Sequence, residues 1–267
     1  MERRVDDDVL LIGWDVGGWD CDRNSRSRDA LVVLDADRHV LGWPWRGNLR
    51  RTINDSATAE DWITRLLNLC SVDPASARAG AVIAIDAPLG VAASFRALLS
   101  GQSPTVEVEA SDSNPYLYRE TERFLIAGGH RPLSAVKDMI GSQSTKAMHA
   151  LARFTPDSKG KGIWAGLGGI EAIEAYPAVA RKSRRVQRML DPYVHAVMTD
   201  GQQFLGPGFE HTDHEDALLC ALVAWLFVHE RDALAPPDET VPEAEGWIWV
   251  PRDALADSPR PLLVERD

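Results

Sequence analysis

Two short apolar runs in the first third of the chain each end at an acidic residue. Val9–Trp14 is followed by Asp15, and Ala81–Ile85 is followed by Asp86. Apolar runs of this length, bounded by turn residues, are typical of buried β-strands. We therefore expect two buried strands that each end in a carboxylate.

The same pattern of apolar and polar positions predicts the other elements. Further strands, each a short apolar run, are expected over residues 30–34, 40–45, 170–176 and 247–250. Helices are expected over residues 55–69, 178–190 and 212–231. The order in this part of the chain is therefore three strands, a helix and a fourth strand.

Residues 88–169 do not fit this regular pattern. The segment is mixed and partly helical, and it is too long to be an ordinary connection. We interpret it as a large insertion after the fourth strand, forming a lid over the sheet of a single domain that spans residues 1–267. Residues 235–267, which begin with a Pro- and Glu-rich loop, are interpreted as a C-terminal appendage.

The positions of Asp15 and Asp86 suggest more than a structural role. If their strands are parallel neighbours, the strand ends lie about 5 Å apart. Two carboxylates at that distance repel each other unless a cation lies between them. The alternative is that each carboxylate accepts hydrogen bonds within its own turn.

A third acidic group begins the last predicted helix. Thr212 and Glu215 have the spacing of a capping box, which explains Glu215 structurally. Asp216 lies one turn into the helix, where Asp is a poor helix former, and it shares a face with Asp213. That face continues with small residues that allow close packing on a sheet, namely Ala217, Cys220, Ala221 and Ala224.

Glu174, in the strand predicted after the insertion, is a further candidate; the alternative is a solvent-facing position. Carboxylates at this density suit Mg²⁺ or Mn²⁺. Paired divalent ions about 4 Å apart are a common device for hydrolysing phosphodiester bonds. His211 and His214, three residues apart, leave open a rival zinc site.

Several motifs resemble those of a family of predicted RNase H-like nucleases. The resemblance spans nearly the whole chain and involves Gly13–Gly18, Ala84–Gly90, Glu174–Pro177, His214–Leu222 and Glu245–Pro251. It implies an α/β ribonuclease H fold, similar to that of RuvC-type resolvases, in which a mixed sheet of three antiparallel strands followed by parallel strands is flanked by helices. It also implies that Asp15, Asp86 and Asp216 are catalytic metal ligands, and that Glu174 and Asp213 are additional ligands of the Mg²⁺ or Mn²⁺.

The net charge of -11 at first argues against a nucleic-acid partner, but the charge is unevenly distributed. Residues 131–188 carry eleven Lys or Arg and four Asp or Glu. If the insertion covers the carboxylates, a nucleic-acid backbone would follow the basic residues Lys159, Lys161, Arg181, Arg184 and Arg185. The alternative is a solvated charged face. Trp164 would stack on a base or cover a hydrophobic edge.

Two other functions remain open. Asp15–Gly18 also resembles the phosphate turn of sugar kinases and actin-like ATPases, but the only further glycine-rich candidate, Gly166–Gly169, lacks a preceding Asp. The chain could instead be a non-catalytic scaffold with the same fold.

The expected environment follows from what the sequence lacks. The N-terminus has no apolar signal region, and the longest apolar run, Ala217–Val228, is shorter than the roughly 20 residues needed to span a bilayer. The three cysteines are far apart in sequence, which argues against a disulfide framework. We expect a cytoplasmic protein without a membrane partner; the oligomeric state is left open, a homodimer included.

Overall fold

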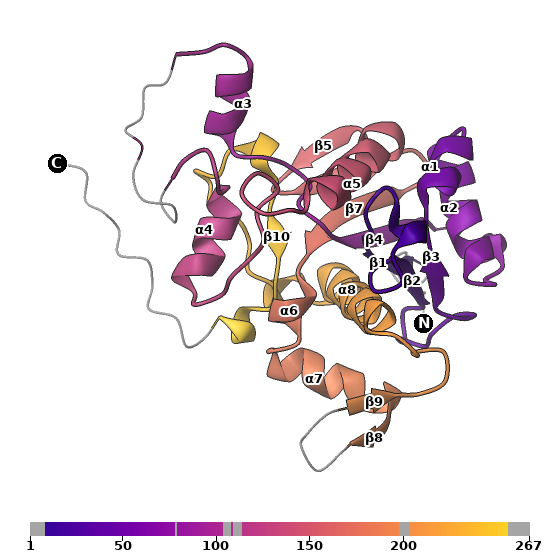
Figure 1. The fold of residues 1–267 in the computed structure, drawn as a ribbon. Helices are drawn as coiled ribbons and strands as arrows, with labels where there is room; N and C mark the ends of the chain where they lie inside the picture. Colours follow the sequence, from indigo (N-terminus) through magenta and orange to yellow (C-terminus); the bar gives the residue numbers. More distant parts are fainter. Residues whose placement is uncertain (1–8, 78, 104–107, 109–113, 198–202, 256–267) are drawn as a thin grey trace.

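The computed structural model describes residues 9–77, 79–103, 108, 114–197 and 203–255. Within them, one mixed sheet of eight strands forms the centre of the molecule (Figure 1). Seven strands follow the order β3-β2-β1-β4-β7-β6-β5, and the eighth, β10, pairs with β7. Their bounds are β1 Leu10–Asp15, β2 Asp29–Leu34, β3 Trp45–Gly47, β4 Ala81–Asp86, β5 Asp157–Gly160, β6 Ile163–Gly166, β7 Ile170–Ala175 and β10 Ile248–Trp249.

Strand directions divide the sheet into three parts. Strand β2 runs antiparallel to both β1 and β3. The central strands β1, β4 and β7 are parallel, and β10 also runs parallel to β7. The hairpin β5–β6 then continues the sheet in antiparallel sense. A separate two-stranded sheet consists of β8 (Val194–Val197) and β9 (Gln203–Leu205).

Helices cover both faces of the sheet and give three layers (Figure 1). The apolar side chains of α1, α2 and α5 pack on one face, and those of α6, α7 and α8 pack on the other. The helix bounds are α1 Arg50–Asp55, α2 Ala59–Leu69, α3 Ala93–Leu99, α4 Glu120–Ala127, α5 Gly141–Phe154, α6 Pro177–Ala180, α7 Arg184–Leu190 and α8 Thr212–His229.

The contact between α8 and β1 is unusually close. A Cβ atom at Gly13 would lie 1.8 Å from the carbonyl oxygen of Ala217 and 2.5 Å from the amide nitrogen of Ala221. The small residues predicted on this face of α8 are all buried. Because the helix backbone nearly touches the strand, acidic residues in the first turns of α8 lie close to the end of β1.

Several predicted boundaries need correction. The strand expected over 40–45 begins only at Trp45, and Val40 forms an isolated bridge to Leu34. The helix expected over 55–69 begins only at Ala59, as α2, and its cap is Thr58, whose Oγ1 accepts from the Asp61 amide at 3.1 Å. Asp55 instead ends a separate helix, α1, which the sequence did not predict.

The predicted capping of α8 is also wrong. His211, not Thr212, precedes the helix, and its Nδ1 accepts from the amide of Asp213 at 3.1 Å. The helix expected over 178–190 is broken as well. Ser183 begins a new helix there, since its Oγ accepts from the Val186 amide at 3.1 Å.

In its described residues, the segment 88–169 contains the helices α3, α4 and α5 and the hairpin β5–β6. Its glycine-rich stretches belong to tight turns: Gly160 and Gly162 flank the β5–β6 turn, and Gly168 and Gly169, both with positive φ, connect β6 to β7. The segment therefore both extends the sheet and, through α5, covers one face of it. The sequence showed the helical part but not the two added strands.

The described part of the predicted C-terminal appendage is built into the body of the protein. Trp247 and Trp249 are buried, and β10 pairs with the end of β7. Residues 256–267 lie outside the described residues. In the part of the chain that the structure describes, no helix has the length and apolar character required to cross a membrane.

The α8–β1 contact can be tested by substitution. Gly13→Ala forces the backbones of β1 and α8 apart, so we expect the free energy of unfolding to fall by about 2–3 kcal/mol in chemical denaturation. Gly141→Ala is the matched control, because a Cβ there would lie 3.9 Å from its nearest atom. Equal stability of the two variants would contradict the close approach.

Candidate functional site

Asp15 and Asp86 are direct neighbours at the carboxyl ends of β1 and β4. The two strands pair in parallel from Leu10 opposite Ala81 to Asp15 opposite Asp86. Residues in register on neighbouring strands project from the same face, with backbones about 4.8 Å apart. Both carboxylates therefore project toward the layer that contains α8, as the sequence predicted for parallel neighbours.

Neither carboxylate has a compensating partner in the described residues. The Asp15 and Asp86 side chains accept no hydrogen bond and form no ion pair there, which argues against the alternative that each serves its own turn. Burial, followed by the charges of Asp86 and Asp216, raises the pKa of Asp15 well above its ordinary value. Burial, followed by Asp216 and Glu174, raises the pKa of Asp86 to about 8.

Asp216 of α8 belongs to the same group of charges. Its carboxylate raises the pKa of both Asp15 and Asp86, which places it near the strand ends. Unlike those two residues it has a partner, because Arg181 Nη2 donates to Asp216 Oδ1 at 3.0 Å. Burial raises the pKa of Asp216, and Arg181 opposes this shift.

Asp213, predicted as an additional metal ligand, is held by other contacts. Its Oδ2 accepts from Arg46 Nε at 2.7 Å and from the amide of Arg28 at 2.9 Å. His211 Nδ1 lies 3.1 Å from Asp213 Oδ1. Asp213 thus links the start of α8 to β3 and to the segment before β2.

Glu174 projects differently from the two strand-end carboxylates. It pairs with Ile85, one residue before Asp86, so it projects from the opposite face of the sheet at its position in β7. Arg119 donates two hydrogen bonds to it, Nη1 to Oε2 at 2.7 Å and Nη2 to Oε1 at 2.6 Å. The Leu89 amide also donates to Oε2 at 2.9 Å. Glu174 is therefore neutralised by an arginine that the sequence analysis did not identify.

Arg119 organises a larger buried cluster at this end of the sheet. It is 1% exposed, and it also donates to Glu122 Oε1 and to the carbonyl oxygen of Glu245. The Glu245 side chain in turn accepts from the amides of Ala93 and Glu120 at 2.7 Å each. This cluster ties the segment after β4, the start of α4 and the segment before β10 to the end of β7.

A pocket of about 230 Å³ opens over the strand-end carboxylates. Asp15, Asp86 and Glu174 lie in its lining, together with Tyr176. Five further lining residues come from the segment 88–169, namely Pro88, Pro132, Leu133, Ile140 and Gln143.

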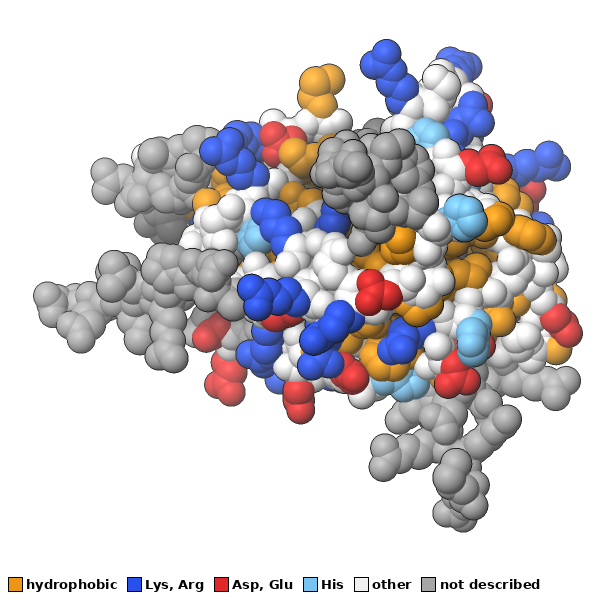
Figure 2. All heavy atoms as spheres, turned by 90° about the horizontal axis from the view of Figure 1, so that it is seen from below, with side chains coloured by type: hydrophobic (Ala, Val, Ile, Leu, Met, Phe, Trp, Pro, Cys, Tyr) orange, Lys and Arg blue, Asp and Glu red, His pale blue; other side chains and the backbone are white. Residues whose placement is uncertain are grey.

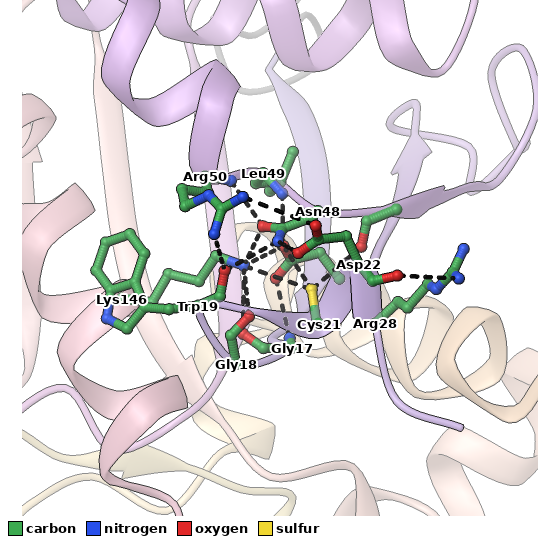
Figure 3. A network of polar contacts seen from close by, with 12 residues as sticks. Gly17, Gly18, Trp19, Cys21, Asp22, Arg28, Asn48, Leu49, Arg50 and Lys146 are labelled. Carbon is green, nitrogen blue, oxygen red and sulfur yellow. Dashed lines mark hydrogen bonds and ion pairs between the residues drawn. The ribbon is translucent and has the colours of Figure 1, made fainter. Parts of the chain in front are cut away.

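A second buried network holds the loop that follows Asp15 (Figure 3). Asp29 Oδ1 accepts from the Gly17 amide at 2.9 Å and from Trp14 Nε1 at 3.1 Å, and Asp29 Oδ2 pairs with Lys146. Lys146 Nζ, from α5, also donates to the carbonyl oxygens of Gly17 and Gly18 at 3.3 and 3.2 Å. Both charged groups are 0% exposed. In the sequence, the one indication of this buried ion pair is a lysine next to the apolar face of a helix.

No group of three or more His, Cys, Asp or Glu side chains is already arranged to hold a metal ion in the residues described. At the strand ends the reason is visible, because Asp216, Asp213 and Glu174 each accept from an arginine. The rival zinc pair is not part of such a group in the described residues either, and His211 Nδ1 accepts from the amide of Asp213 at the start of α8.

The predicted basic residues do not form one surface at the site. Lys159 and Lys161 lie in β5 and its turn, and β5 is three strands from β4, or about 14 Å across the sheet. Arg185 pairs with Glu230, whereas Arg184 is exposed. Figure 2, seen from the α7 side, shows basic side chains interspersed with acidic ones. Of the five, Arg181 is the one in contact with a candidate ligand.

Two other predicted features have structural roles. Trp164 lies in β6 and packs against the buried core, with its ring next to Gly246, so it covers a hydrophobic edge. Gly166–Gly169 forms the end of β6 and the turn into β7, which gives it a structural reason other than phosphate binding. The three cysteines are buried and unpaired.

Comparison of the chain with protein-family models, with curated proteins and with solved structures finds no match. The site is therefore interpreted from its own geometry.

The unpartnered carboxylate pair predicts a specific dependence of stability on pH. Asp86 binds a proton more tightly in the folded chain than in the unfolded chain, so its contribution to stability falls as pH rises from about 4 to 8. We expect Asp86→Asn, measured by urea denaturation with EDTA, to be about 1–3 kcal/mol more stable than the wild type at pH 8 and nearly equal at pH 4.

The exposed Asp37 supplies the control, since Asp37→Asn should alter stability equally little at both pH values. A destabilised Asp86→Asn variant at pH 8 would show that the carboxylate is stabilised by its surroundings.

The buried Arg119 cluster predicts a large loss of stability on truncation. Arg119→Ala leaves Glu174 and Glu122 buried without a counter-charge, so the free energy of unfolding should fall by about 3–5 kcal/mol in urea denaturation. Arg123→Ala, which removes an exposed pair with Glu120 on the same helix, should cost less than about 1 kcal/mol. Similar losses for both variants would refute the role of Arg119.

Proposed function

We propose that the chain is a nuclease that depends on Mg²⁺ or Mn²⁺ and hydrolyses phosphodiester bonds in nucleic acid. One observation carries this proposal: Asp15 and Asp86 stand side by side in register, without a counter-charge in the described residues, at the floor of a pocket. Acidic side chains that the fold holds close together despite their repulsion commonly form cation-binding sites.

The donor set fits a hard divalent cation. Carboxylate oxygens are the ligands that Mg²⁺ and Mn²⁺ prefer, and Asp15, Asp86 and Asp216 supply three carboxylates. The raised pKa values of all three follow first from burial and, for Asp15 and Asp86, then from the negative charges of neighbouring carboxylates, which a bound cation would offset. In this proposal Asp216 exchanges Arg181 for the cation when it becomes a ligand.

Paired divalent ions at such a site supply an activated water and stabilise the leaving oxygen. The residues of the chain position the substrate around them. Arg181, once released from Asp216, is placed to contact a phosphate oxygen of the substrate. Arg119 neutralises Glu174 at the pocket wall, so that less negative charge faces the anionic substrate. On this proposal Glu174 and Asp213 position the site, and a role for either as a direct ligand requires it to leave its arginine.

The sheet supports the ribonuclease H-like interpretation. Its antiparallel strands β3, β2 and β1, followed by parallel β4 and β7, have the arrangement that the resemblance implies. The carboxylates lie at the ends of the first and fourth strands, and the last long helix brings a third acidic residue. The principal alternative is a binding scaffold of the same fold without catalysis.

The proposal predicts metal-dependent cleavage that requires Asp86. With Mn²⁺, the wild type should cleave at least one member of a panel of single strands, flaps, hybrids and junctions. Asp86→Asn should lower the rate at least about 100-fold, because it weakens cation binding in the transition state. Asp37→Asn should cleave at the rate of the wild type. An intact panel under all metal conditions would reject catalysis and favour the scaffold.

Metal binding has a second readout that needs no substrate. Because Asp86 has a pKa of about 8, Mn²⁺ binding near pH 7 should release protons from the carboxylate group. Calorimetric titration of Mn²⁺ in two buffers of different ionisation enthalpy measures this release. The release should be smaller in Asp86→Asn, which keeps Asp15 and Asp216 but lacks the Asp86 proton. The same heat in both buffers for the wild type would contradict the proposed site.

A further inference from the structure

A second, larger pocket lies on the other side of the wall of the carboxylate pocket. It encloses about 640 Å³ and is lined by residues 118–138. Pro132 and Leu133 line both pockets, so this residue pair separates them. The other lining residues of the second pocket are Tyr118, Ile126, Gly129, His130, Arg131, Lys137 and Asp138. We call this space the Arg131 pocket.

Positively charged side chains are concentrated around the Arg131 pocket. Arg131 is exposed, and its side chain forms no ion pair within the described parts of the chain. Lys137 lies over the ring of Tyr118, 5.0 Å from its centroid, and donates to the Tyr118 hydroxyl. Lys182 Nζ lies 3.3 Å from His130 Nδ1. Among the described residues of the lining, Asp138 is the one acidic residue.

Hydrogen bonds fix the wall between the two pockets in place. Tyr176 follows β7 and lines the carboxylate pocket, and its hydroxyl donates to the carbonyl oxygen of Arg131 at 3.0 Å. Ser134 Oγ is hydrogen-bonded to the carbonyl oxygen of Leu117, and the Ser134 amide donates to Asp138 Oδ2 at 2.8 Å. The wall between the pockets is therefore fixed to the sheet and to the segment before α4.

The top of the wall is apolar and open to solvent. Leu133 is 53% exposed, and the nearby Met139 is 100% exposed. An apolar ridge between a carboxylate pocket and a cationic pocket matches the alternation of a nucleic-acid strand, in which charged phosphates are separated by less polar sugars and bases.

We propose that the Arg131 pocket binds a phosphate of a single-stranded segment of nucleic acid whose scissile phosphodiester lies over Asp15 and Asp86. This inference rests on the proposed function and specifies which surface holds the substrate. Arg131 and Lys137 contact the phosphate, and the sugar or base passes over Leu133. The basic residues at β5 and α7 are not part of this path.

A binding experiment without cleavage tests the pocket. A fluorescein-labelled single-stranded dodecamer is titrated in EDTA, with fluorescence anisotropy recorded at several salt concentrations. The variant is Arg131→Gln/Lys137→Met, which removes two charges and keeps side chains of similar length. The control is Arg51→Gln/Lys159→Met, which removes the same residue types from α1 and β5. Thermal unfolding checks that both proteins fold.

We expect the Arg131→Gln/Lys137→Met variant to bind at least about tenfold more weakly than the wild type. Its slope of log affinity against log salt should fall by about 0.7, because each phosphate of a single strand that the protein neutralises contributes about 0.7. The control should retain the affinity and slope of the wild type. A duplex of the same sequence should bind more weakly than the single strand.

The binding and cleavage experiments distinguish an error in this inference from an error in the proposed catalysis. Equal affinity of the variant and the wild type, an equal loss in the control, or no binding of the single strand would overturn the Arg131 pocket. Binding that depends on Arg131 and Lys137, together with no cleavage under any metal condition, would leave the pocket standing and reject the nuclease activity.

Discussion

The parallel pairing of β1 with β4 in a single register is the constraint on which the site depends. Successive residues of a strand project to opposite faces, so a shift of one residue would move Asp86 to the far side of the sheet from Asp15. The register is held by buried apolar residues on both faces of both strands. Packing that stabilises the core therefore also holds two mutually repelling carboxylates together. Gly13 adds to this by admitting α8, and with it Asp216, close to the strand end.

At this end of the sheet, some of the acidic residues have a cationic partner and others do not. Asp29, Asp213 and Glu174 each have a cationic partner, supplied by Lys146, Arg46 and Arg119. Asp216 has a partner at a more exposed position, and Asp15 and Asp86 have none within the described residues. The stabilised acids fix the loops around the pocket, whereas the unpartnered ones lie at its floor. The fold thus separates acids that hold the structure from acids that remain available for a ligand.

The sequence was informative where a pattern is local. A strand that ends in Asp, or a helix face of small residues, can be recognised from neighbouring positions, and Asp15, Asp86 and the contact of α8 with the sheet were predicted in this way. The projection of Glu174 depends on its register with β4, and Arg119 is 55 residues from Glu174, so neither could be predicted from local pattern. The hairpin β5–β6 was missed because its glycines, required by two tight turns, obscure the strand pattern.

The residues that build and surround the pocket are far apart along the chain, and this affects the order in which they become available during synthesis. Asp15 and Asp86 are synthesised early, but Lys146, which holds the loop after Asp15, comes much later, and Asp216 and Glu245 come later still. A nascent chain therefore carries the repelling pair before the elements that position and cover it. The pocket can be completed only after Glu245 has been synthesised, so a nascent chain that stops before this residue has no complete site.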